Sequence, residues 1–296
     1  MPELPEIETY LHALEARLRG AVLETVRVRS PALLRTYDPP LSSAHGRRVL
    51  GVRRLGKRIV LALEGDLYLV LHLMITGRLS WQPRGAKVPG RVGLAAFDFD
   101  TGTLLLTEAG TKKRAALHVV QGGAIVAELD RGGIEPLEAS LEAFGRALRS
   151  ENHTLKRALT DPRILSGIGN AHSDEILHAA RLSPFKRTAQ LSDEEVARLF
   201  ETTRTSLVEW IERLRGEVGE GFPKKITAFH PAMRVHGRFR QPCPVCGTAI
   251  QRVVHGEHET NYCPRCQTGG RVLRDRALSR LLGDDWPRTI DALEGV

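Results

Sequence analysis

The spacing of apolar and polar positions divides the chain into a helical start, a long β-rich stretch and a second helical stretch. Near the N-terminus, apolar side chains recur at helical spacing, at Ile7, Leu11, Leu14 and Leu18. This amphipathic stripe predicts a helix over residues 3–19. Pro2 and Pro5 fit its first turn, where backbone amides have no partner within the helix.

The β-rich stretch runs from about residue 22 to residue 129. Its apolar residues lie in short runs separated by Gly and Asp turns, at Val49–Val52, Ile59–Leu63, Leu67–Leu73, Gly93–Phe99, Thr103–Leu106 and Ala116–Val120. Many short strands at such spacing are typical of a β-sandwich or barrel.

Helical patterns follow between about residues 136 and 219. Ser192 begins a capping box that predicts a helix to about Leu214, and a shorter helix is expected over residues 170–180. The Gly- and Lys-rich residues 219–231 are expected to form a linker, and an amphipathic helix is expected over residues 274–282. The whole pattern predicts a multidomain α+β protein.

The charge of the chain favours a polyanionic partner without requiring one. Across 296 residues, 43 Lys and Arg stand against 35 Asp and Glu, a formal net charge of +8. Residues 47–58 hold six cations and no acid, and Lys112, Lys113 and Arg114 form a second basic cluster. Such surfaces can bind nucleic acid. Because no apolar run is long enough to span a membrane and the first ten residues lack a secretory signal, a cytoplasmic or nucleoid protein is expected.

The four cysteines lie in two pairs, Cys243 with Cys246 and Cys263 with Cys266, and 16 residues separate the pairs. Two residues between thiols allow one tight turn to present both sulfurs to a single ion, and four thiolates complete the tetrahedral shell that Zn²⁺ prefers. A closed shell leaves no position for substrate, so one structural zinc ion is expected. Two disulfides in a secreted protein are the alternative, which the lack of a secretory signal disfavours.

The segment between the cysteine pairs has strand character on both sides of a turn near residues 255–257, which predicts a β-hairpin anchored at the metal. Residues 231–275 contain seven Arg and three acids. Such a hairpin is suited to contact a phosphate backbone. The same charges would also suit an ordinary solvated surface.

The sequence Gly167-Ile168-Gly169-Asn170 is another candidate contact. Glycines let a backbone approach a ligand closely, and free amides at the start of a helix favour an anion. A lone motif of this kind is equally an ordinary turn before a helix, so by itself it supports either interpretation.

Taken in order along the chain, four features resemble the formamidopyrimidine-DNA glycosylase and endonuclease VIII family. They are the N-terminal Met-Pro-Glu-Leu-Pro-Glu, Gly56-Lys57-Arg58, the Gly-Ile-Gly-Asn turn followed by Asp174-Glu175-Ile176-Leu177, and the four-cysteine module. The resemblance covers about residues 2–268. It implies an N-terminal catalytic β-sandwich domain over 1–132, a helix–two-turn–helix domain over 133–222, a zinc finger over 232–270 and a tail over 271–296.

The resemblance further implies base excision repair of double-stranded DNA by a chain that acts as a monomer. An oxidised base would be excised and the abasic strand then cleaved. By the same resemblance, Pro2 is the nucleophile and Glu3 the acid that opens the sugar ring. Lys57, which belongs to the catalytic set, and Asn170 would hold the phosphates that flank the extruded nucleotide.

The chemistry of an N-terminal proline agrees with these implied roles. If Met1 is removed, Pro2 presents a secondary amine, and α-amino groups titrate at about 7.7–8.0 against about 10.4 for lysine, so more of the amine is nucleophilic at neutral pH. Attack on the sugar C1′ expels the base and leaves an iminium, which acidifies the C2′ protons and allows elimination. On sequence physics alone, Pro2 and Glu3 would be an ordinary helix start, and with Met1 attached Pro2 is an inert amide.

Several positions depart from the family pattern, and they concern the substrate. Family members specific for oxidised guanine insert Met, Arg and Phe side chains into the gap that the extruded nucleotide leaves in the base stack. Here Ile75 stands at the Met position, and Met74 is expected on the opposite face of a strand. The second loop, residues 110–116, lacks the aromatic wedge, which leaves Lys113 or Arg114 to reach the orphaned base.

The hairpin differs as well, because His258 stands where an Arg is usual, which predicts a weaker and pH-dependent phosphate contact. These changes weaken the expectation of an 8-oxoguanine preference.

Two other functions are also compatible with the sequence. One is a non-catalytic binder of damaged or abasic DNA, and the other is a zinc-ribbon RNA-binding protein, for which Pro2 and Glu3 would have no purpose.

Overall fold

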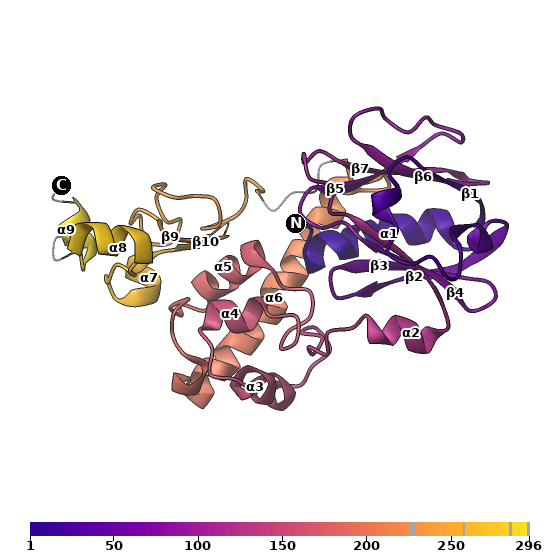
Figure 1. Cartoon of the computed structure of the whole chain (residues 1–296). Helices are drawn as coiled ribbons and strands as arrows, with labels where there is room; N and C mark the ends of the chain where they lie inside the picture. The colour runs from indigo at the N-terminus through magenta and orange to yellow at the C-terminus, as the bar shows by residue number, and fades with distance from the viewer. Residues whose placement is uncertain (225, 227–228, 257, 284–285, 295–296) are drawn as a thin grey trace. The chain divides into compact units, whose positions relative to one another are not determined.

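The structure is a computed structural model that describes residues 1–224, 226, 229–256, 258–283 and 286–294, with the backbone alone at 258, 276–278 and 293–294. These residues form two compact units (Figure 1). The first contains Met1–Arg131 and Glu209–Ala228, and the second contains Gly132–Val208 and Phe229–Val296. Contacts therefore group the chain differently from the four predicted domains, whose boundaries stay a prediction.

The first unit is built on helix α1 (Leu4–Leu18) and an eight-stranded antiparallel sheet. The strands are β1 (Val22–Val28), β2 (Arg47–Leu55), β3 (Arg58–Leu63), β4 (Leu67–His72), β5 (Gly77–Gln82), β6 (Gly93–Phe99), β7 (Gly102–Glu108) and β8 (Ala116–Gln121). Their order is β5-β7-β6-β1-β2-β3-β4-β8. All six runs predicted as strands form strands, and β1 and β5 complete the sheet. Short helical segments are η1 (Pro31–Leu33), η2 (Leu41–Ala44) and α2 (Gly123–Glu128).

The sheet folds into two layers where β1 meets β2 (Figure 1). These strands pair over two residues each, Val22–Leu23 with Arg47–Arg48, whereas the other neighbouring strands pair over most of their length. One core contains fully buried side chains from α1 and from both layers, among them Leu14, Phe97 and Leu69. The predicted sandwich is therefore confirmed as one continuous sheet whose layers share a core with α1.

The second unit contains most helices of the stretch between about residues 136 and 219 that was predicted to be helical. They are α3 (Leu141–Arg149), α4 (Leu155–Thr160), α5 (Asn170–Ala179), η3 (Thr188–Gln190) and the first part of α6 (Asp193–Val218). The capping box before α6 is confirmed, because the Ser192 hydroxyl accepts from the Glu195 amide at 3.3 Å and the Ser192 amide donates to the Glu195 carboxylate at 3.0 Å. Although α6 has 26 residues, no helix in the described part of the chain is both long and apolar enough to cross a membrane.

The C-terminal part of this unit is a hairpin with a tail packed against it. Strands β9 (Gln251–His255) and β10 (His258–Tyr262) pair antiparallel, and α7 (Pro264–Thr268), α8 (Arg276–Leu282) and α9 (Ile290–Glu294) follow. The amide of Val254 in β9 donates to Oδ2 of Asp275 at 2.8 Å, and the amide of Leu273 donates to the hydroxyl of Tyr262 at 2.8 Å. The hairpin between the cysteine pairs is thus confirmed, and the tail supports it.

Candidate active site and nucleic-acid interface

The N-terminal segment holds two buried carboxylates at the start of α1. Pro2 is buried, and Glu3 and Glu6 are 2% and 1% exposed. The amide of Glu3 donates to Oε2 of Glu6 at 2.7 Å, and the amide of Glu6 donates in turn to the side chain of Glu3. This reciprocal capping box fixes the first helical turn and keeps both carboxylates beside the chain terminus.

The terminal amine has surroundings that favour its neutral form. Burial lowers the pKa of the Met1 amino group, Glu3 opposes this effect, and the cations Arg78 and Lys57 add to it. A lower pKa increases the nucleophilic fraction of an amine at neutral pH. The same surroundings would act on the Pro2 nitrogen once Met1 is removed.

Lys57 lies in the tight turn between β2 and β3, directly after Gly56, whose φ of 60° is in the left-handed region that favours glycine. The six cations of residues 47–58 do not act as one free patch. For example, Nε of Arg54 donates to Oε1 of Glu8 at 2.9 Å, so this guanidinium is used within the first unit. Lys57 belongs instead to the side chains whose charges act on the terminal amine.

A turn between β4 and β5 carries Met74 and Ile75, so the strand expected at this point is wrong. Met74 has a φ of 53°, and its amide donates to Nδ1 of His72 at 2.9 Å. Ile75 is 46% exposed. The two side chains therefore occupy successive positions of a turn that presents Ile75 to solvent.

The loop between β7 and β8 is organised by Glu108, whose side chain is 1% exposed. Its Oε2 accepts hydrogen bonds from the amide of Arg114 at 2.9 Å and from the amide of Ala115 at 3.2 Å. The Lys113 ammonium donates to the carbonyl of Glu108, whereas the Arg114 side chain is exposed. The two cations that the sequence leaves as candidates thus differ, because the protein itself binds Lys113.

Asn170 begins α5, and its Nδ2 donates to the carbonyl of Glu259 in β10 at 2.9 Å. Asp174, one turn further, accepts from the amide of Asn261 at 3.2 Å. Glu175 accepts from three successive amides at 2.7 to 2.9 Å, those of Arg234, Val235 and His236. One face of α5 thus holds both the hairpin and the segment that leads into it. The side chain of His258 lies outside the described residues, so its phosphate contact stays a prediction.

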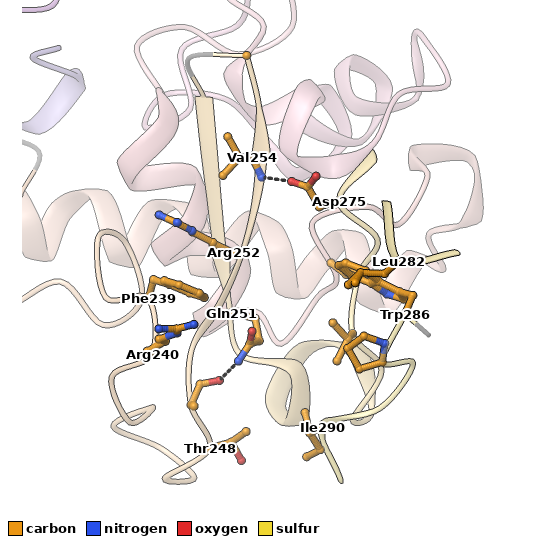
Figure 2. A pocket seen from close by; sticks show the side chains of 15 residues that line it. Phe239, Arg240, Thr248, Gln251, Arg252, Val254, Asp275, Leu282, Trp286 and Ile290 are labelled. Atoms are coloured by element: carbon orange, nitrogen blue, oxygen red, sulfur yellow. Dashed lines mark hydrogen bonds between the residues drawn. The ribbon is translucent and has the colours of Figure 1, made fainter. Parts of the chain in front are cut away.

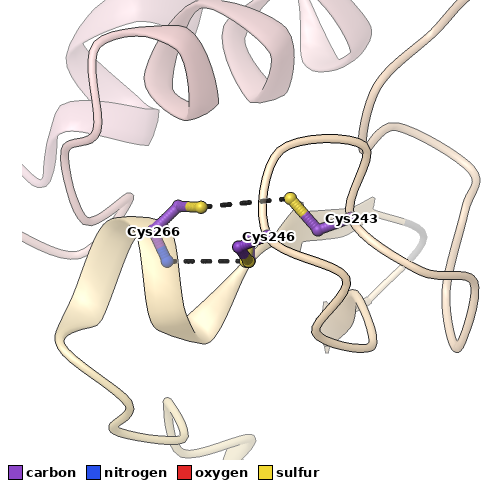
Figure 3. Close-up of side chains that lie close together, drawn as sticks. Cys243, Cys246 and Cys266 are labelled. Carbon is purple, nitrogen blue, oxygen red and sulfur yellow. Dashed lines mark hydrogen bonds between the residues drawn. The ribbon is translucent and has the colours of Figure 1, made fainter.

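The four cysteines lie close together, and Figure 3 shows three of them, Cys243, Cys246 and Cys266. Their sulfur atoms all lie within 4.8 Å of one another, with 3.4 Å between Cys246 and Cys263 and 3.9 Å between Cys243 and Cys266. A tetrahedral zinc ion with Zn–S bonds of about 2.3 Å places its sulfurs about 3.8 Å apart, so this donor set fits one zinc ion. Burial raises the pKa of the Cys263 and Cys266 thiols, and a divalent cation offsets that effect by favouring thiolates.

His178 of α5 is a residue of the metal centre that the sequence pattern did not reveal. Its Nε2 lies 3.3 Å from Sγ of Cys243, and the side chain is buried. Burial lowers the pKa of this imidazole to about 4, so the neutral ring can donate one N–H to a thiolate. A single histidine 65 residues before its partner gives no sequence pattern by which to find it.

A cavity of about 730 Å³ lies between the hairpin and the tail (Figure 2). Its walls include Phe239 and Arg252 on one side and Trp286 of the tail on the other. The guanidinium of Arg252 lies 4.3 Å from the ring centroid of Phe239, a cation–π contact. The tail therefore supplies one wall of a cavity that the hairpin alone would not enclose.

Three family models match successive parts of the chain. The formamidopyrimidine-DNA glycosylase N-terminal domain matches residues 1–115, the formamidopyrimidine-DNA glycosylase H2TH domain matches 133–219, and a zinc finger found in FPG and IleRS matches 240–269. Residues beyond 269 fall outside these models.

Named relatives agree with the family models. The formamidopyrimidine-DNA glycosylase of Heliobacterium modesticaldum is 36% identical over 280 residues, which cover 90% of this chain and 100% of the relative. That of Thermus thermophilus is 35% identical over 282 residues, which cover 91% of this chain and 100% of the relative.

Solved structures show the same fold. The crystal structure of the MutM (Fpg) protein from Thermus thermophilus has a TM-score of 0.76 and 34% identity, over 90% of this chain and 98% of the other. A complex between Lactococcus lactis Fpg and DNA containing an abasic site has a TM-score of 0.79 and 23% identity, over 90% and 99% of the two chains. With its buried Pro-Glu terminus and four-cysteine centre, this chain belongs to the formamidopyrimidine-DNA glycosylase family.

Proposed function

We propose that this chain is a bifunctional DNA glycosylase and abasic-site lyase of base excision repair. It would excise an oxidised base through a Schiff base on Pro2 and then cleave the abasic strand by elimination. The observation that carries this proposal is the buried N-terminus, where two carboxylates and two cations surround an amine whose pKa is lowered by burial. The capping box accounts for the two carboxylates as a helix start, while an amine with a lowered pKa is what a nucleophile requires.

The reaction begins once Met1 has been removed. The Pro2 nitrogen bonds to C1′ of the sugar while the glycosidic bond breaks, and the base leaves with the electron pair of that bond. The departing base takes up the proton that the Pro2 nitrogen loses. Glu3, fixed by the capping box, then gives a proton to the ring oxygen as the bond between this oxygen and C1′ breaks, and the nitrogen lone pair completes an iminium. The iminium withdraws electrons from C2′, so loss of a C2′ proton expels the 3′ phosphate. Hydrolysis of the iminium then returns the free amine.

The other predicted site residues would hold the DNA. Lys57 and Asn170 would bind phosphates beside the extruded nucleotide, and His258 would contact a phosphate from the hairpin. Ile75 would enter the stack where the base has left, with Arg114 or Lys113 beside it. Ile75 and the cationic loop would thus fill this space without an aromatic ring. This difference supports a substrate range that is not limited to 8-oxoguanine.

A zinc ion bound by the four thiolates would supply a fixed cross-link at the base of the hairpin. It would have no part in the bond changes, because all four of its positions are taken. The substrate is double-stranded DNA that carries a damaged base or an abasic site. We infer that the protein acts on it as a monomer, in the cytoplasm or at the nucleoid.

Borohydride trapping on a duplex with one abasic site tests the proposal, because borohydride reduces the iminium to a stable amine. We expect a covalent adduct with the wild-type protein, whose removal of Met1 is verified by mass spectrometry. Pro2→Gly should abolish the adduct. A matched form that retains one residue before Pro2 should bind DNA without forming the adduct, since its Pro2 nitrogen is an amide.

The possible outcomes separate the three functions. DNA binding with no adduct in the fully processed wild-type protein would identify a non-catalytic binder of damaged DNA. Preference for RNA over duplex DNA would identify an RNA-binding protein. Either result would refute the proposed activity.

A further inference from the structure

Hydrogen bonds join the two loops that are proposed to enter the DNA stack. Thr76, next to Ile75 in the β4–β5 turn, accepts from the amide of Gly110 at 3.3 Å and donates to Oε1 of Glu108 at 3.5 Å. Gly77 pairs with Glu108 across β5 and β7. The loops also fit closely, because a Cβ added to Gly110 would lie 2.9 Å from the Thr76 hydroxyl. The turn and the loop therefore form one structural unit.

Both loops converge on the Glu108 carboxylate. One oxygen accepts the amides of Arg114 and Ala115, and the other faces Thr76. Hydrogen bonds to an ionised carboxylate are stronger than those between neutral groups. A buried carboxylate that loses its donors is also unfavourable. The loop therefore cannot leave this position without exposing Glu108 or leaving it unsatisfied.

The charges of the loop point to the same residue. Lys112, Lys113 and Arg114 are successive cations that repel one another, and the Lys113 ammonium is held at the main-chain carbonyl of Glu108. Because Lys113 is bound to the Glu108 carbonyl, the exposed Arg114 is the better placed of these two side chains to reach a base. Its own backbone amide is the one that Glu108 holds at 2.9 Å.

We propose that Glu108 is a positioning residue that sets the opposite-base preference of the enzyme by fixing Arg114, an inference that rests on the proposed function. An arginine that donates two N–H groups to a base edge discriminates between bases by roughly tenfold or more. That discrimination depends on placement, since a displacement of about 1 Å is enough to lose a productive geometry. Glu108 provides the placement before DNA arrives, and touches no reacting atom itself.

The test is the opposite-base ratio at a single abasic site. The ratio is kcat/KM for strand cleavage with the best of the four opposite bases, divided by kcat/KM with the worst. An abasic lesion removes any preference for the excised base, and a ratio does not depend on the active fraction of the preparation. We expect a ratio of about ten in the wild type and about two or less in Glu108→Ala. Glu108→Gln, which keeps an acceptor oxygen, should retain most of the ratio.

Two further variants make the result specific. Glu64→Ala removes an exposed carboxylate in a different turn of the same unit and should leave the ratio unchanged. Arg114→Ala should lower the ratio as far as Glu108→Ala does, and Glu108→Ala should have no additional effect on the ratio in the Arg114→Ala protein.

Three results would overturn the proposal: a wild-type protein with no opposite-base preference, a Glu108→Ala ratio within twofold of wild type, or an equal effect of Glu108→Ala with and without Arg114. A Glu108 variant that is merely less stable would lower cleavage opposite every base equally and keep the ratio. Failure of the proposed function would appear separately, as a wild-type protein that forms no borohydride adduct.

Discussion

Buried acidic side chains are the residues that fix the functional loops of the first unit. Glu6 accepts the amide of Glu3, and Glu108 accepts the amides of Arg114 and Ala115. Burial of a carboxylate is unfavourable unless donors satisfy it, and here the donors are backbone amides of the segments that would meet DNA. Each buried carboxylate thus replaces its lost water contacts with backbone amides, and these hydrogen bonds fix the conformation of that segment.

Glu3→Gln tests the proposed role of Glu3 as the acid that opens the sugar ring. The amide side chain keeps the shape of the capping box but has no acidic proton to give to the sugar ring. We expect base excision to fall by about a hundredfold or more. Cleavage of preformed abasic sites, whose ring opens readily without the enzyme, should fall by only a few fold. Single-turnover assays on the two substrates measure this difference.

Glu8→Gln is the matched control, since Glu8 lies on the same helix and its carboxylate pairs with Arg54 and Arg215. It should preserve both activities. Equal loss of excision and abasic cleavage in Glu3→Gln would count against the role of Glu3 as the acid.

At the scale of elements, α5 connects the proposed phosphate contact to the zinc hairpin. Asn170 at the start of the helix bonds to β10, Asp174 bonds to Asn261 of the same strand, and His178 contacts the ligand Cys243. Successive turns of one helix thus hold the hairpin at several points. Loss of the metal would loosen one end of this arrangement and leave the sheet of the first unit, which shares no ligand with it, intact.

Chelation of zinc should therefore reduce DNA affinity more than it reduces the stability of the β-rich unit. We expect affinity for abasic duplex to fall by about tenfold or more, because the hairpin's phosphate contacts are lost with its fixed geometry. Thermal unfolding of the sheet, followed by circular dichroism, should change little. Affinity should return when zinc is added back, and full affinity in metal-free protein would contradict the hairpin's role.

At the scale of the whole molecule, the excess of basic residues explains a general attraction to DNA, while the internal ion pairs limit how many cations contribute. Arg27 with Asp98 and Arg54 with Glu8 are examples of cations already used for folding. The total of 43 Lys and Arg therefore overstates the number of cations available for phosphate contacts.

Lys57→Ala tests a single one of these contacts. Removal of one phosphate-binding cation should weaken binding about equally for every lesion and reduce the slope of log affinity against log salt by about 1. Filter-binding or anisotropy titrations over a range of salt concentrations measure both quantities. Arg19→Ala removes an exposed cation that pairs with Glu15 and should leave the slope unchanged. A Lys57→Ala protein with an unaltered slope would show that Lys57 binds no phosphate.

Short-range patterns in the sequence predicted many of the helices and strands and the metal centre. The period of apolar residues locates α1 and most strands, and the cysteine spacing identifies the zinc ligands because all four lie within 24 residues. Glu108 and His178 escaped prediction for a physical reason. A single buried acid or histidine has no period, and its role depends on contacts with residues whose proximity only the folded chain creates, such as Thr76 with Glu108 or Cys243 with His178.

At the turn containing Ile75, the sequence predicted a strand that the structure does not contain. Its apolar residues continue the pattern of β4, so the sequence favours a longer strand. The hydrogen bond from Met74 to His72 and the left-handed backbone at Met74 end the strand instead. Side-chain bonds of this local kind compete with strand pairing, and a pattern of apolar positions does not record them.

The buried start of α1 has a practical consequence for anyone who makes this protein. A polyhistidine tag or fusion partner placed ahead of Met1 would prevent the removal of Met1, so the nitrogen of Pro2 would stay an amide. By the proposed mechanism, the recombinant protein would then keep its fold and bind DNA without turnover. By the proposed mechanism, a newly translated chain would be inactive in the same way until an aminopeptidase removed Met1. Cleavage of the single peptide bond between Met1 and Pro2 would thus convert a protein that only binds damaged DNA into an enzyme.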